Sequence, residues 1–278
     1  MLCGTPALAQ KAGPRLVSVG FALPRGMGER MASLSTSISG GDFSIGALIS
    51  GTFSVLHGAL PKFLALSAIP LVPSLLLLLF GGVPTADNAG SYGLLAGATS
   101  LVGGVLLFMI QGATVFAAVN EIRGRSFTVG EALSKGLARF WPLLGVAIVA
   151  SICIGLGALL LLVPGLILLC MWYAASAVCV VEKEGIGSSL SRSSWLTKGY
   201  RWKIFALILI VGIAGAIVGA IVGGVGAAVG GFWIARLVSL VVQLYANAFG
   251  SVLIALTYYS LRAIKEGVDI DRIADVFN

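Results

Sequence analysis

The sequence predicts an all-α integral membrane protein, and its composition is the first reason. Hydrophobic residues make up 58% of the 278 residues, charged residues make up only 10%, and the mean hydropathy is +1.03. In a soluble domain about a quarter of the residues are charged. A soluble core of this length would need a charged shell that this chain cannot build, so lipid is expected to cover much of its surface.

Six apolar stretches are the second reason, because each is long enough for a transmembrane helix of about 20 residues. Glycine, proline or charge bounds each of them, and the fourth is the shortest. The expected spans are Leu60–Phe80, Leu94–Val119, Pro142–Val163, Leu166–Val181, Ile204–Val229 and Leu237–Leu261. Pro164-Gly165 predicts a sharp reversal between the third and fourth spans, since proline cannot continue a helix and glycine accepts positive φ.

Three short segments that resemble one another each precede a pair of spans, and they are the third reason. They are FSIGALISGTFSVL from Phe43, FTVGEALSKGLARF from Phe127 and GIGSSLSRSSWL from Gly185. Apolar residues recur with helical spacing in the first two, and Thr128 with Glu131 forms a capping-box pattern. We therefore predict three pseudo-repeats, each a short interfacial amphipathic helix followed by a transmembrane hairpin.

The third segment differs from the other two because hydroxyls replace most of its apolar face, among them Ser189, Ser193 and Thr197. We expect this helix to lie higher in the membrane interface, where lysine and arginine meet anionic headgroups. Aromatic residues that suit the same boundary are Trp141, Trp195, Tyr200 and Trp202.

Basic residues predict the orientation of the spans. From Phe43 onward the chain has fourteen lysines and arginines; thirteen fall on one side of a six-span topology and only Arg236 falls on the other. Basic loops stay in the cytoplasm, so both termini are expected there. The basic residues form no patch with interleaved aromatics, so nucleic acid is not an expected partner.

The chain divides into two parts of different composition. Residues 1–42 are expected to be a disordered N-terminal segment, and residues 43–278 the six-helix transmembrane domain. The block that begins at Met31 looks like a natural start, so we predict that translation starts at Met31 or Met27.

The expected spans carry no pattern typical of catalysis. They contain no Asp, Glu or His, and the sequence has no H-E-x-x-H, G-x-S-x-G or P-loop motif. Cys153, Cys170 and Cys179 lack metal-ligand spacing and are expected to be small core residues. We therefore predict no catalytic residue, no cofactor and no metal, and we do not expect an enzyme.

One polar face lies within a span. Arg236, Ser239, Gln243 and Asn247 have helical spacing on the sixth span, and Gln111 on the second could meet them. Polar groups at this depth are costly unless they are paired or hydrated, so the face should point into the bundle or a cavity. Two interpretations stay open: amides that join helices, or a path for a substrate or lipid headgroup in which Arg236 binds phosphate.

Glycines recur every four residues on the fifth span, at Gly215, Gly219 and Gly223. Such a stripe lets another helix approach closely and predicts helix packing on this face. The alternative is a thin or mobile helix that shapes a pocket.

The run EGIGSSLSRSSWLTKG from Glu184, with YYSLRAIKEGVDID from Tyr258, resembles a family of bacterial multi-pass proteins related to the membrane domain of glycerophosphoryl diester phosphodiesterases. The residues that carry the resemblance are Glu184, Gly185, Leu190, Arg192, Ser193, Trp195, Leu196, Thr197, Gly199, Trp202, Tyr258, Tyr259, Leu261, Arg262, Glu266 and Gly267. The resemblance implies an α-helical domain of the bacterial inner membrane. The soluble enzyme's metal-binding carboxylates and paired histidines have no counterpart, since His57 is the only histidine.

The leading hypothesis is a non-enzymatic polytopic protein of the bacterial inner membrane that handles lipid or organises the membrane. Its expected partners are membrane lipids with anionic headgroups and a second protein. One alternative is a small transporter or channel that uses the Gln243 and Asn247 face. The other is a membrane anchor for a separate soluble phosphodiesterase.

Overall fold

The computed structural model describes residues 43–82, 85, 87–122, 125–226, 228 and 231–266. Within these residues the chain forms helices and no strand. Six helical stretches are long and apolar enough to cross a membrane, which confirms the all-α multi-pass class. The interpretations of residues 1–42, including the start at Met27 or Met31, lie outside the described residues.

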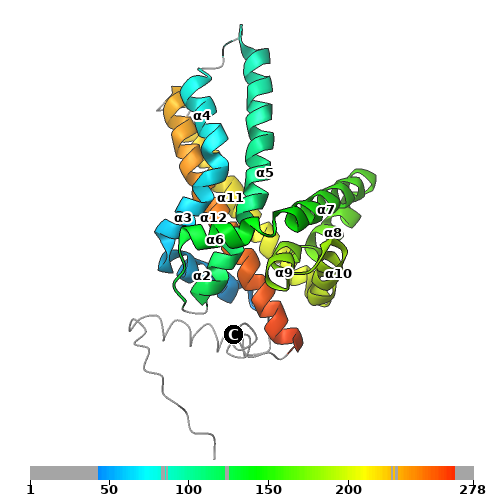
Figure 1. Cartoon of the computed structure of the whole chain (residues 1–278). Helices are drawn as coiled ribbons and strands as arrows, with labels where there is room; N and C mark the ends of the chain where they lie inside the picture. Colours follow the sequence, from blue (N-terminus) through cyan, green and yellow to red (C-terminus); the bar gives the residue numbers. More distant parts are fainter. Residues whose placement is uncertain are drawn as a thin grey trace, which may run out of the picture.

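In the described chain a short helix precedes each of three pairs of apolar helical stretches that are long enough to cross a membrane. The helices are α2 (Ile45–Gly58), α3 (Leu60–Ala68), η1 (Ile69–Leu71), α4 (Val72–Phe80), α5 (Ala89–Ile122), α6 (Val129–Leu137), α7 (Phe140–Leu160), α8 (Leu162–Met171), α9 (Ala175–Val181), α10 (Ile186–Thr197), α11 (Arg201–Val225) and α12 (Gly231–Glu266). The short helices α2, α6 and α10 gather at one end of the molecule, and the last turns of α12 reach the same end (Figure 1).

The apolar faces of α2 and α6 pack on the bundle. Leu48 and Leu56 of α2 are buried in the main hydrophobic core. In α6, Gly136 lies so close to α5 that an added Cβ would come within 2.5 Å of the backbone nitrogen of Ala113. These two helices therefore contribute to the core through most of the faces that the apolar periodicity predicted, but Phe53 and Leu137 of those faces are 44% and 45% exposed.

Hydroxyls cap both of these helices. The Ser44 side chain accepts a hydrogen bond from the N–H of Ala47 at 3.5 Å, and the Thr128 side chain accepts one from the N–H of Glu131 at 3.1 Å. Each bond satisfies a backbone donor that has no partner inside the helix. The Thr128 half of the predicted capping box is therefore formed.

Helix α10 differs from the expectation that its hydroxyls face the interface. Ser189, Ser193 and Thr197 are each 0% exposed and point into the bundle. The reason is a break in the fourth span, where α8 ends at Met171 and α9 begins at Ala175. Ser193 Oγ and Thr197 Oγ1 donate to the Met171 carbonyl at 2.9 and 3.2 Å. Backbone oxygens without partners are costly inside a membrane, and α10 supplies the missing donors.

The reversal between the third and fourth spans occurs at Leu161, so its expected position at Pro164-Gly165 is wrong. Leu161 alone separates α7 from α8 and has an extended backbone (φ −158°, ψ 132°). Pro164 instead lies in the first turn of α8, where its missing N–H costs no helical hydrogen bond. Gly165 lets α8 approach α7, because an added Cβ would lie 2.7 Å from the nitrogen of Ala158.

The longest helices exceed the thickness of a bilayer core. Helix α12 has 36 residues, which corresponds to about 54 Å against a hydrocarbon thickness of about 30 Å. Its buried residues are Leu240 and then, from Ala248 onward, most of its second half. The core therefore surrounds the second half of α12, and its first half has few neighbours in the described chain.

Candidate functional site

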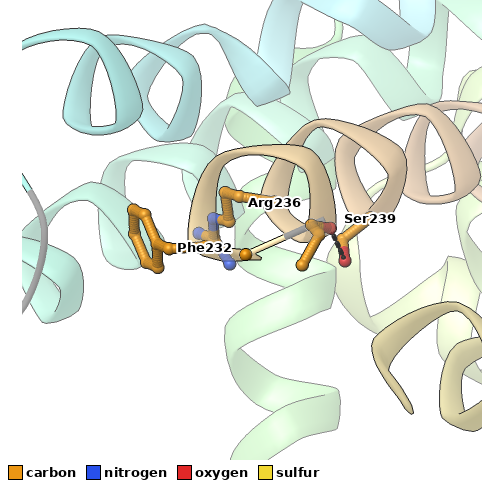
Figure 2. Close-up of a pocket in the computed structure, with 5 residues that line it drawn as sticks. Phe232, Arg236 and Ser239 are labelled. Carbon is orange, nitrogen blue, oxygen red and sulfur yellow. Dashed lines mark hydrogen bonds between the residues drawn. The ribbon is translucent and has the colours of Figure 1, made fainter. Parts of the chain in front are cut away.

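Arg236 lies in the sparsely packed first half of α12 and lines an open pocket of about 360 Å³. The other described lining residues are Gly231, Phe232, Ala235 and Ser239. Figure 2 shows Phe232, Arg236 and Ser239 on the same side of the helix. The Ser239 hydroxyl donates to the Ala235 carbonyl at 2.7 Å, so the helix backbone already occupies it.

The guanidinium of Arg236 has no counter-ion in the described part of the chain, where the ion pairs involve other arginines. Its side chain is half-buried. A half-buried cation without a partner is costly near hydrocarbon, and a bound anion would lower that cost. Arg236 is therefore the predicted site residue that retains free binding capacity.

The other members of the predicted polar face do not join Arg236. Gln243 is exposed on the outer surface of α12, so the expectation that the whole face points inward is wrong at this residue. Asn247 is half-buried, and its backbone carbonyl accepts a hydrogen bond from Ser251. Gln111 donates to Ser176 of α9 at 3.3 Å. The structure thus places these residues at separate positions, because the first half of α12 lacks the neighbours that would enclose its polar side.

The glycine stripe of α11 makes no close contact within the described chain. An added Cβ at Gly215, Gly219 or Gly223 would meet nothing within 4 Å, so the predicted packing on this face does not occur there. Close approaches of the expected kind occur at other glycines, where an alanine lies opposite: Gly136 with Ala113, Gly165 with Ala158 and Gly226 with Ala235.

A second polar cluster lies at the opposite end of α12, and sequence reasoning did not assemble it. We call it the charge ring, and its members are Glu182, Arg192, Tyr258, Arg262 and Glu266. Arg192 Nε donates to Glu182 Oε2 at 2.9 Å, and Tyr258 donates to Glu182 Oε1 at 2.8 Å. Arg262 donates to Tyr258 at 3.1 Å and to Glu266 at 2.7 Å, and Arg192 Nη2 closes the ring on Glu266.

The charge ring is complete in itself. Two arginines balance two glutamates, and each carboxylate accepts two of the hydrogen bonds just described. Burial disfavours the charged guanidinium of Arg192, but hydrogen bonds and the charges of Glu182 and Glu266 outweigh it and hold the pKa of Arg192 above its ordinary value. Because its charges are already paired, the ring joins α9, α10 and α12 and offers no free cation to a ligand.

The indole of Trp195 contacts two cations beside the charge ring. The guanidinium carbon of Arg192 is 5.0 Å from the centre of the indole, and Lys265 Nζ is 5.1 Å from it. Lys265 also donates to the Trp195 carbonyl at 3.1 Å. Stacking of this kind stabilises the contact between α10 and α12.

The Arg236 pocket and the charge ring lie at opposite ends of one helix. Arg236 and Arg262 are 26 residues apart (262 minus 236), which is about 39 Å along an α-helix and more than the thickness of the hydrocarbon layer. The charge ring belongs to the end that holds the short helices (Figure 1). The two polar regions can therefore face opposite surfaces of a membrane.

The described residues contain no group of three or more metal-ligating side chains. Cys170 and Cys179 are buried and Cys153 is partly buried, all as free thiols, which agrees with their expected role in packing. The fold therefore defines an all-α multi-pass membrane protein. Comparison with family models, curated proteins and solved structures finds no match.

Proposed function

We propose that this chain is a non-enzymatic lipid-handling protein of the bacterial inner membrane, and that it binds the phosphate of an anionic lipid headgroup at Arg236. The observation that carries the proposal is a half-buried arginine, without a counter-ion in the described chain, that lines an open pocket. A guanidinium offers a planar fork of donors that matches two phosphate oxygens. Lipid phosphate is the anion that occurs at the boundary between hydrocarbon and water.

The position of the pocket along α12 supports a headgroup ligand. Arg236 is the sixth residue of a 36-residue helix that is longer than the hydrocarbon layer, so the pocket lies toward one membrane surface. Phe232 provides an apolar wall one helical turn away. A headgroup could thus bind Arg236 while its acyl chains follow the apolar side chains of α12, among them Ile234 and Val241, which are more than half exposed.

Exposed tryptophans support the proposed orientation of the opposite end. Trp141 and Trp202 stand at the starts of α7 and α11 and are 76% and 83% exposed. Tryptophan concentrates at the level of the headgroups, where its ring contacts hydrocarbon and its N–H contacts water. This end carries most of the chain's lysines and arginines and is the proposed cytoplasmic side.

A continuous polar path for transport has no such support, because Gln243 lies on the outer surface of α12.

The proposal is tested by titrating phosphatidylglycerol, with phosphatidylcholine as the neutral reference, onto the full-length protein in detergent and counting bound lipids by native mass spectrometry. Arg236→Gln should weaken phosphatidylglycerol binding roughly fivefold, since a basic residue near an anionic surface contributes about 1 kcal/mol. Arg236→Lys should retain part of the binding because it keeps the charge but loses the fork.

Arg125→Gln is the matched control, because Arg125 is exposed and precedes α6 at the other end of the molecule. It removes the same charge and should leave the affinity for the pocket unchanged. Equal affinity of Arg236→Gln and the unmodified protein would refute headgroup binding at this pocket. An equal loss in both variants would show a general effect of net charge and would refute it as well.

A further inference from the structure

The hairpin of α7 and α8 ends in an apolar tip whose side chains are largely exposed. Leu159, Leu160, Leu161, Leu162 and Val163 are between 65% and 83% exposed. From Ile152 to Met171 no side chain carries a nitrogen or oxygen atom. Exposed leucines along the side of a span are expected in a membrane protein, but here they also form the turn itself.

Part of the backbone of this turn is paired within the protein. The Leu161 N–H donates to the Gly157 carbonyl at 3.1 Å. The first turn of α8 would normally leave several N–H groups without partners, and Pro164 has none to leave. Gly165 packs against Gly157 and Ala158 and holds the two helices together. Pairing at Leu161 and proline at position 164 therefore reduce, but do not eliminate, the unpaired backbone groups of the turn.

The turn between α4 and α5 has the opposite chemistry. It contains Thr85, Asp87 and Asn88, and the Thr85 N–H donates to the Asn88 side chain at 2.6 Å. These residues suit an aqueous surface. The contrast within one chain indicates that the two turns lie in different surroundings.

The direction of the hairpin points to the same conclusion. Buried residues of α7 are Leu143 and Val146, both in its first two turns, so the rest of α7 leaves the bundle, and α8 returns to it at the buried Cys170. Figure 1 shows α7 and α8 running outward at a steep angle to α5. Helix α7 has 21 residues, about 31 Å, which reaches across a core of about 30 Å only when the helix stands upright.

We propose that the α7–α8 tip is a lipid-contacting surface that ends among the acyl chains and does not reach the far aqueous phase. Its partner is the hydrocarbon of the bilayer. The hairpin enters and leaves at the same membrane surface, so the sides of all other loops are unchanged. This inference is independent of headgroup binding at Arg236.

Spin-label accessibility tests this placement. A nitroxide is attached to Leu161→Cys in the full-length chain with its native cysteines replaced by alanine, reconstituted in vesicles of phosphatidylcholine and phosphatidylglycerol. Ile213→Cys on the exposed face of α11 is the hydrocarbon reference, and Asp87→Cys in the α4–α5 turn is the aqueous reference. Collisions with dissolved oxygen report hydrocarbon, and collisions with a water-soluble nickel chelate report water.

The label at Leu161 should match the Ile213 reference with both reagents, with high oxygen and low nickel accessibility. Nickel accessibility equal to that at Asp87 would overturn the inference, because the turn would then lie in water. Low accessibility to both reagents would also overturn it, because protein would then cover the tip. Leu159→Cys, 83% exposed on the same tip, repeats the measurement if Leu161→Cys does not fold.

Discussion

The contact between α6 and α5 can be tested by adding one methyl group to α6. In Gly136→Ala the new Cβ would lie 2.5 Å from the nitrogen of Ala113 and 2.8 Å from its Cα. These are backbone atoms of a long helix and cannot move aside as a flexible side chain would. Overpacking of this kind costs about 1–3 kcal/mol, while alanine regains about 0.5–1 kcal/mol of helix propensity. The difference is an expected net loss of up to about 2.5 kcal/mol, centred on about 1 kcal/mol.

Gly130→Ala is the matched control, because Gly130 belongs to the same helix and an added Cβ there meets nothing within 4 Å. At this position the substitution changes only the helix propensity, which favours alanine over glycine. The free energy of unfolding should therefore stay equal to that of the unmodified protein or rise by up to about 1 kcal/mol. The thermal midpoint of the full-length protein in detergent, followed by tryptophan fluorescence, should be lowest for Gly136→Ala. A Gly136→Ala variant as stable as Gly130→Ala would show that α6 does not pack on α5 as described.

Two further predictions concern α10. Arg192→Gln opens the charge ring on both sides and leaves Glu182 and Glu266 without their shared cation. The thermal midpoint should therefore fall by an amount that corresponds to about 2 kcal/mol of stability. An unchanged midpoint would mean that the ring contributes nothing to stability. Ser193→Ala removes one of the two donors to the Met171 carbonyl and should cost about 1 kcal/mol. Ser191→Ala on the exposed side of α10 should change stability by less than about 0.5 kcal/mol, and equal effects of the two serine variants would contradict the burial of Ser193.

Hydropathy was sufficient to locate the six apolar helical stretches, because each combines the length and the apolarity that crossing a membrane requires. The first span matches its predicted bounds, Leu60–Phe80, at both ends. The breaks within spans were harder to predict. Proline at position 70 explains the 3₁₀ turn of η1, whereas Trp172–Ala174 interrupts the fourth span without proline or glycine. The break depends on α10, whose hydroxyls donate to the Met171 carbonyl. The apolar periodicity within the fourth span cannot reveal a contact with a later helix.

The candidate site was only partly predictable for a related reason. Arg236 stood out as the one basic residue on its side of the topology, and it does line a pocket. Gln243 was misplaced, because helical spacing tells which residues share a face but not which helix covers that face. The charge ring joins Glu182 to Tyr258 across 76 residues, and only the packing of α9 against α12 brings them together. The i, i+4, i+8 spacing of Tyr258, Arg262 and Glu266 was the available signal.

The broken fourth span has a consequence for how the protein is made. The Met171 carbonyl leaves the ribosome 22 residues before Ser193 and 26 residues before Thr197, the two side chains that satisfy it. When the fourth span first meets lipid, its interruption therefore has no donors of its own. The hydrogen bonding of this segment is therefore complete only after α10, the next helix in the chain, has been synthesised.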